Sequence, residues 1–101
     1  MKANFQSVNF TADRKLIDFI QRRLDKLEQF YQGITSGEVY LKVENNSSKE
    51  NKQVEIKLSI PGRKLVASKE ARSFEEAADL GAEALRRQLK KHKGKERRVV
   101  A

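Results

Sequence analysis

The residues best suited to chemistry in this chain are the cations gathered near its C-terminal end. Between Arg86 and Arg98 the segment RRQLKKHKGKERR carries eight Lys and Arg residues opposed only by Glu96, so it holds +7 of a net charge of +8. Such side chains bind phosphate by charge and, for arginine, by paired N–H donors. A charge that served solubility alone would be spread along the chain. The concentration therefore favours a polyanion-binding surface, for nucleic acid first, then an anionic membrane, then an acidic protein.

A second, smaller basic set lies in the first third of the chain. Arg22, Arg23 and Lys26 fall within about one helical turn. Like charges spaced i,i+4, as Arg22 and Lys26 are, destabilise a helix by roughly 0.2–0.5 kcal/mol unless an anion lies nearby. Asp18 and Asp25 could supply that anion, so a solvated face explains this set equally well. If the helices pack side by side, both basic sets would form one surface that meets phosphates.

Residues that would support catalysis are scarce. There is no cysteine, which excludes disulfides, thiolate metal sites and a thiol nucleophile. His92 is the single histidine, and the lysines around it would repel a metal ion. The paired carboxylates Glu75 and Glu76 fit a helix-capping role, and no glycine-rich phosphate loop is present. We therefore expect no enzyme activity, no metal, no cofactor and no small-molecule substrate.

Hydrophobic periodicity predicts two helices that would position the cations. The first is predicted over about 13–31, with Thr11 as its cap and Gly33 closing it. The second is predicted from the capping box at Ser73 to about Lys93, where Gly94 would end it. Its inward face is rich in small residues, which implies an unusually close approach to its neighbour: Phe74, Ala77, Ala78, Gly81, Ala82, Leu85 and Leu89.

Four strands are predicted around these helices. The segments EVYLKVEN and KQVEIKLSI alternate apolar and polar residues, as in a sheet with one buried and one solvated face. A short strand is predicted over 2–10, and Pro61-Gly62 suits a type II turn into a fourth strand around Leu65 and Ala67. The polar segment NNSSKENK is expected to be a mobile hairpin loop. The predicted fold class is α+β, in the order β-α-β-β-β-α, a four-stranded mixed sheet with both helices packed on one face.

The length of 101 residues suits one domain. We expect a single α+β domain over 1–94, followed by a basic, flexible C-terminal tail over 95–101. No apolar run approaches the roughly 20 residues of a membrane span, and the start MKANFQSVNF is unlike a signal peptide. A soluble, cytoplasmic protein is therefore predicted.

Three segments, LEQFYQGI, IPGRKLVAS and FEEAADLGAEALRRQLKKHKGK, resemble in that order the ribosome hibernation promoting factor family, also called ribosome-associated inhibitor or sigma-54 modulation proteins. The resemblance covers essentially the whole chain and is most specific between Ala78 and Lys95. It implies the fold just described and a protein that binds ribosomal RNA of the small ribosomal subunit, near the decoding and transfer-RNA sites, and stops translation during stress. The residues expected to bind RNA are Arg22, Arg23, Lys26, Arg86, Arg87, Lys90, Lys91, Lys93 and Lys95.

Two features depart from the family pattern. Ser73 and Phe74 stand where the family commonly has Asp and then Tyr, so a contact through that hydroxyl would be missing. The chain also stops soon after the basic helix and so resembles the short type, which lacks a C-terminal dimerisation domain; we expect a monomer off the ribosome.

The alternative function is that of a general structured-RNA-binding or ribosome-assembly protein, and a third is an interaction module for an acidic protein. Tyr40 is the one aromatic residue expected on the solvated sheet face. Base stacking on the sheet is therefore disfavoured, and recognition of RNA shape and backbone is favoured.

Overall fold

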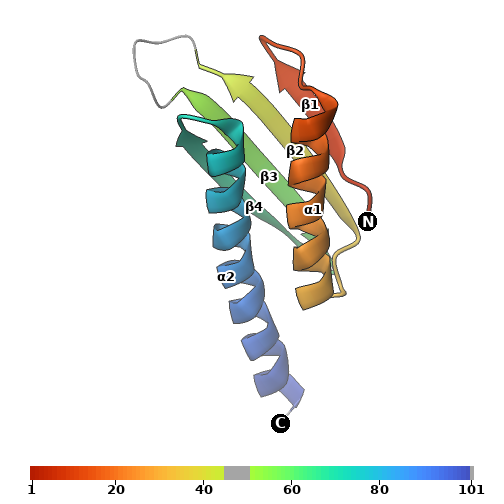
Figure 1. Ribbon diagram of the computed structural model, residues 1–101. Helices are drawn as coiled ribbons and strands as arrows, with labels where there is room; N and C mark the ends of the chain where they lie inside the picture. Colours follow the sequence, from red (N-terminus) through yellow and green to blue (C-terminus); the bar gives the residue numbers. More distant parts are fainter. Residues whose placement is uncertain (45–50, 101) are drawn as a thin grey trace.

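The computed structural model describes residues 1–44 and 51–100, and their side chains as far as Lys95 (Figure 1). The elements follow the predicted β-α-β-β-β-α order: β1 (Asn4–Val8), α1 (Arg14–Phe30), β2 (Ser36–Val43), β3 (Lys52–Ile60), β4 (Arg63–Ala71) and α2 (Phe74–Val100). The expected mobile loop falls mainly on 45–50, which lie outside the described residues.

The four strands form one mixed sheet in the order β1-β2-β3-β4. β1 runs parallel to β2, with Phe5 opposite Val39, and the other two pairs are antiparallel. Parallel neighbours need a crossover, which α1 provides. Pro61 and Gly62 join β3 to β4, and Gly62 has a φ of 85°, the value that the second central position of a type II turn requires. The predicted turn is confirmed.

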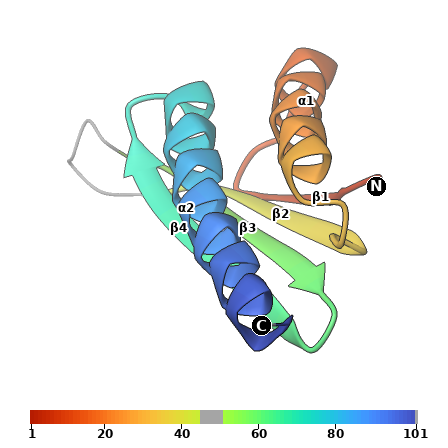
Figure 2. The ribbon, with the colours of Figure 1, turned by 90° about the horizontal axis from the view of Figure 1, so that it is seen from below.

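Both helices cover the same face of the sheet, and the other face is left open (Figures 1 and 2). The core lies between the helices and the sheet, and among the described residues it contains no buried polar or charged side chain. Its largest fully buried side chains come from α1, α2 and the three strands β2, β3 and β4: Ile20, Leu24, Leu85, Leu89, Val39, Leu41, Val54, Ile56, Leu58 and Leu65. The predicted two-layer α+β fold is confirmed.

The ends of α1 differ from the prediction. Asp13, not Thr11, is the cap, because its carboxylate accepts a hydrogen bond of 2.8 Å from the Leu16 amide. Asp13 stands three residues before that amide, which is the spacing that side-chain capping needs. The helix ends at Phe30, and the next residue already has extended backbone, so Gly33 does not close it.

The start of α2 matches the prediction, and its end does not. Ser73 Oγ accepts a hydrogen bond of 3.1 Å from the Glu76 amide. The helix then passes through Gly94 and ends at Val100, so the expected end at Gly94 is wrong. A glycine inside a helix costs about 1 kcal/mol relative to alanine, and the Lys, Arg and Glu residues beside it are good helix formers. The segment expected as a separate tail therefore begins as a continuation of α2.

Phe74, which stands where the family commonly has Tyr, is part of the core. It is buried, and its ring stacks on that of Phe10 with the ring centres 4.6 Å apart. An aromatic ring is what this position needs for packing, and the ring provides it without a hydroxyl.

Small residues let α2 lie close to the sheet, as predicted. Ala77, Ala78 and Gly81 are buried against it, and a Cβ added to Gly81 would lie 3.2 Å from the Ile56 Cδ1 of β3. The close neighbour is thus the sheet. In Figure 2, α2 lies over β3 and β4, beside α1, and Figure 1 shows its last turns extending beyond the end of α1.

Candidate nucleic-acid interface

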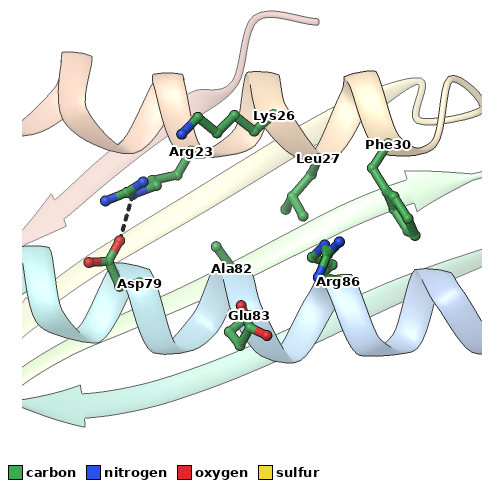
Figure 3. Close-up of a pocket in the computed structure, with 8 residues that line it drawn as sticks. All are labelled: Arg23, Lys26, Leu27, Phe30, Asp79, Ala82, Glu83 and Arg86. Carbon is green, nitrogen blue, oxygen red and sulfur yellow. Dashed lines mark ion pairs between the residues drawn. The ribbon is translucent and has the colours of Figure 1, made fainter.

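A groove of about 330 Å³ lies between α1 and α2, with the sheet behind it (Figure 3). Its lining residues recur every three or four positions on each helix, which is the spacing that places side chains on one helical face. Leu27, Phe30 and Ala82 are the apolar part of the groove, and cations and carboxylates lie around them. The complete lining is Arg23, Lys26, Leu27 and Phe30 from α1, and Asp79, Ala82, Glu83 and Arg86 from α2.

Arg23 joins the two helices across this groove. Its Nε lies 2.6 Å from Asp79 Oδ1, in an ion pair that lacks the alignment of a hydrogen bond. Its guanidinium carbon also lies 4.9 Å from the centre of the Phe19 ring. Both charged side chains are more than a third exposed, so the pair contributes about 0–1 kcal/mol to stability. Its main effect is to balance the Arg23 charge and hold this side chain in one position.

Phe30, the last residue of α1, contacts two cations of α2. The Arg86 guanidinium carbon lies 5.1 Å from the ring centre, and Lys93 Nζ lies 4.6 Å from it. Lys93 Nζ also donates a hydrogen bond of 3.0 Å to the Phe30 carbonyl. The last turn of α1 has no basic residue of its own, so Lys93 provides the cation that a helix C-terminus favours. Lys93 therefore fastens α2 to the end of α1.

Most of the predicted RNA-binding cations have no carboxylate partner. In the part of the chain that the structure describes, their ion pairs are limited to Arg23 with Asp79 and Arg87 with Glu83, the latter at 4.0 Å. The other seven make no ion pair within that part: Arg22, Lys26, Arg86, Lys90, Lys91, Lys93 and Lys95. Their charge is therefore available to an external anion.

The structure brings one group of these cations together along the groove. Arg23, Lys26 and Arg86 line it. Lys90 and Lys93 follow Arg86 by four and seven residues, which places them on the same side of α2. We call these five residues the groove cluster.

A second group lies on another side of α2. Each residue turns an α-helix by about 100°, so Arg87, Lys91 and Lys95 are rotated by roughly 100–180° from Arg86. Gln88 lies next to Lys91 and Lys95 on the helix surface and donates a hydrogen bond of 3.1 Å to the Val66 carbonyl of β4, so these two lysines are turned away from α1. We call Arg87, Lys91 and Lys95 the outer cluster. The single basic surface expected from the sequence is therefore divided between two sides of α2.

Arg22 belongs to neither cluster. It lines a separate hollow near the start of both helices, together with Lys15, Phe19 and Glu75. Acidic residues occupy this end, since α2 has Glu75 and Glu76 in its first turn, where a helix dipole favours negative charge. Positive charge is thus in excess in the C-terminal half of the helix pair, and a polyanion would meet its cations there.

The open face of the sheet is a poorer candidate. Tyr40, its half-buried aromatic residue, has Lys57 Nζ over the ring at 5.4 Å, and its hydroxyl contacts Glu38 at 3.4 Å. Basic and acidic residues face each other across the strands, as Glu38 and Lys57 do. This face carries no excess of positive charge comparable with that of α2.

Sequence reasoning missed Phe30 and the carboxylates as parts of the groove. Phe30, Asp79 and Glu83 are not among the binding residues expected from the sequence. One signal was available. Phe30 follows Arg23 and Lys26 at seven and four residues, so an aromatic ring on the same helical face as two cations was visible in the spacing.

The chain matches, over residues 3–97, the family described as sigma 54 modulation protein / S30EA ribosomal protein. The chain belongs to this family. The resemblance inferred from the sequence is therefore confirmed.

Relatives with established names support the same membership. The chain is 34% identical over 100 residues to a ribosome hibernation promoting factor of Pseudomonas putida, covering 99% of this chain and 94% of that protein. It is 32% identical over 96 residues to one of Azotobacter vinelandii, covering 95% and 86%.

Two solved structures share the fold. The N-terminal domain of Thermus thermophilus Protein Y superposes with a TM-score of 0.79 at 19% identity, covering 91% of this chain and 99% of that one. A ribosomal subunit interface protein from Coxiella burnetii superposes with a TM-score of 0.82 at 19% identity, covering 93% and 99%. At this identity the likeness shows the fold alone.

Within the described ranges, no helix combines the length and apolar character needed to cross a membrane. The same residues contain no group of three or more His, Cys, Asp or Glu side chains placed to hold a metal ion. That the protein is not an enzyme stays a prediction.

Proposed function

We propose that this protein binds ribosomal RNA of the small ribosomal subunit, near the decoding and transfer-RNA sites, and blocks translation under stress. Family membership and relatives named ribosome hibernation promoting factor support this proposal. The observation that carries it is the row formed by Lys26, Arg86 and Lys90, cations along one groove that have no carboxylate partner among the described residues.

The groove cluster is suited to phosphate because its spacing is set in advance. Arg23 and Lys93 tie α1 to α2 through Asp79 and Phe30, so the backbone positions that carry the unpaired cations are held at a fixed separation. A binding site that is already ordered loses less entropy when its ligand arrives. A domain seated in this way over ribosomal RNA would exclude messenger and transfer RNA by its volume.

Co-sedimentation with purified small subunits at two or more salt concentrations tests the proposal. With ~4–6 phosphates neutralised, the plot of log affinity against log salt should have a slope of about −3 or steeper. The double variant Lys26→Gln/Lys90→Gln should flatten the slope by about 1.5, since each lost phosphate contact removes roughly 0.7–0.9. A matched control is Lys57→Gln/Lys64→Gln on the sheet, which removes the same charge and should leave the slope unchanged.

Competition distinguishes this function from its alternative, a general structured-RNA-binding or ribosome-assembly protein. Saturating transfer RNA and messenger RNA on the small subunit should displace the protein. Binding that is indifferent to them rejects the block of translation, and a flat salt plot rejects both RNA functions in favour of an acidic protein partner.

A further inference from the structure

Arg86 is the arginine of the groove that has no carboxylate partner among the described residues. Arg23 is occupied by Asp79, whereas Arg86 makes no ion pair within the described residues and is held by the Phe30 ring instead. A ring holds the guanidinium without using its N–H donors. Arg86 therefore presents to the groove a fork that can bind two acceptor atoms in one plane.

Glu83 places an acceptor beside that fork. It stands three residues before Arg86, so both side chains lie on one wall of the groove, about 5–6 Å apart at their Cβ atoms. Its own ion pair with Arg87 is long, at 4.0 Å, and both partners are mostly exposed, so the Glu83 carboxylate is weakly held. One wall of the groove thus combines the N–H donors of Arg86 with the two carboxylate oxygens of Glu83 as acceptors.

The rest of the groove suits a small planar ligand. Leu27, Phe30 and Ala82 are its apolar part, and the volume of about 330 Å³ is at the lower end of the range for ligand pockets. That volume admits one nucleobase. Lys26 and Lys90, close to the groove, are available to the phosphates on either side of such a base.

We propose that the groove takes one unpaired guanine of the bound RNA, with Arg86 reading O6 and N7 and Glu83 accepting from N1–H and N2–H. Guanine matches this wall because its two acceptors and two donors follow one another around the ring. Adenine and cytosine present an amino group, which is a donor, where guanine has the acceptor O6. Uracil has one ring N–H donor where guanine has the two donors N1–H and N2–H. Arginine to O6 and N7 is the commonest base-specific contact of proteins with guanine. The inference rests on the proposed function, since it names the base recognised at that same site.

Chemical probing of small subunits saturated with the full chain tests the proposal. Kethoxal, which reacts with N1 and N2 of unpaired guanines, should lose its reaction with one guanine when the protein binds. Arg86→Lys, which keeps the charge but not the fork, and Glu83→Gln should each restore that reaction and weaken binding about 10-fold, the usual loss for one bidentate base contact. The control Arg63→Lys, at the β3–β4 turn, should keep the protection.

Hydroxyl-radical cleavage of the same complexes reports backbone contact and separates two kinds of failure. If the backbone is protected but no guanine depends on Arg86 and Glu83, the guanine site is wrong while the proposed function stands. If the backbone is not protected at all, both are wrong. Circular dichroism of each variant shows that the comparison is made between folded proteins, which is expected because both side chains are exposed.

Discussion

Lys93 should contribute to the stability of the free protein, although its charge belongs to a set that sequence reasoning assigned to RNA. The side chain is half-buried, donates a hydrogen bond to the last carbonyl of α1 and lies over the Phe30 ring. Replacing it by methionine keeps most of the apolar stem and removes the ammonium. Lys93→Met is therefore a direct test of whether α1 and α2 are joined at this point.

The three terms at Lys93 have known sizes. A hydrogen bond from a charged donor contributes about 1.5–3 kcal/mol when buried, and less at a half-buried site. A cation over an aromatic ring adds roughly 0.5–1 kcal/mol, and a cation at a helix C-terminus roughly 0.3–1 kcal/mol. Because the three share one ammonium they do not add, and we expect a loss of about 1–2 kcal/mol, or roughly 5–10 °C in Tm for a domain of this size.

Urea unfolding at neutral pH measures this loss, and Lys91→Met is the matched control. Lys91 is exposed, lies in the outer cluster and makes no ion pair in the described part of the chain, so its replacement should change stability by no more than about 0.5 kcal/mol. Equal stability of the two variants would refute the connection between the helices. If the loss of stability in Lys93→Met disappears in high salt, the contribution of Lys93 is a surface charge effect and not a connection between the helices.

Three further predictions test the interface and the fold. Lys90→Glu should weaken binding to small subunits more than Lys91→Glu by about 10-fold in co-sedimentation, because Lys90 faces the groove; the reverse order would place the interface on the outer cluster. Gly81→Val should lower the free energy of unfolding by about 1–3 kcal/mol in urea, since its Cβ would lie 3.2 Å from an isoleucine methyl of β3, and an unchanged midpoint would contradict the close packing. Asp13→Ala should cost about 1 kcal/mol by the same method and Thr11→Ala much less, whereas equal costs would contradict the cap at Asp13.

The local pattern of apolar and polar residues was sufficient to predict the helices and strands and their arrangement in two layers. The period-two alternation of Val39 to Val43 and of Val54 to Ile60 requires a sheet with one apolar face, and two helices with apolar stripes then have that face alone to cover. Side-chain period is a property of neighbouring residues, so it can be read without the fold. Pro61-Gly62 could be read as a turn for the same reason.

The helix ends were harder because several local signals compete there. Thr11 and Asp13 are both good caps, and the choice depends on which of them lies three residues before the first free amide that needs a partner. A glycine ends a helix only where the backbone leaves the helical conformation at that point. At Gly94 it does not, and α2 continues through this residue.

The sequence by itself determined which residues are cationic, that they are concentrated on α2, and that the chain belongs to its family. Only the tertiary structure decided which of them can act together. Arg86 and Arg87 are adjacent and chemically identical, yet one faces α1 across the groove and the other does not. The physical reason is that the orientation of α2 about its own axis is set by packing Gly81, Leu85 and Leu89 on the sheet, and those contacts are long-range.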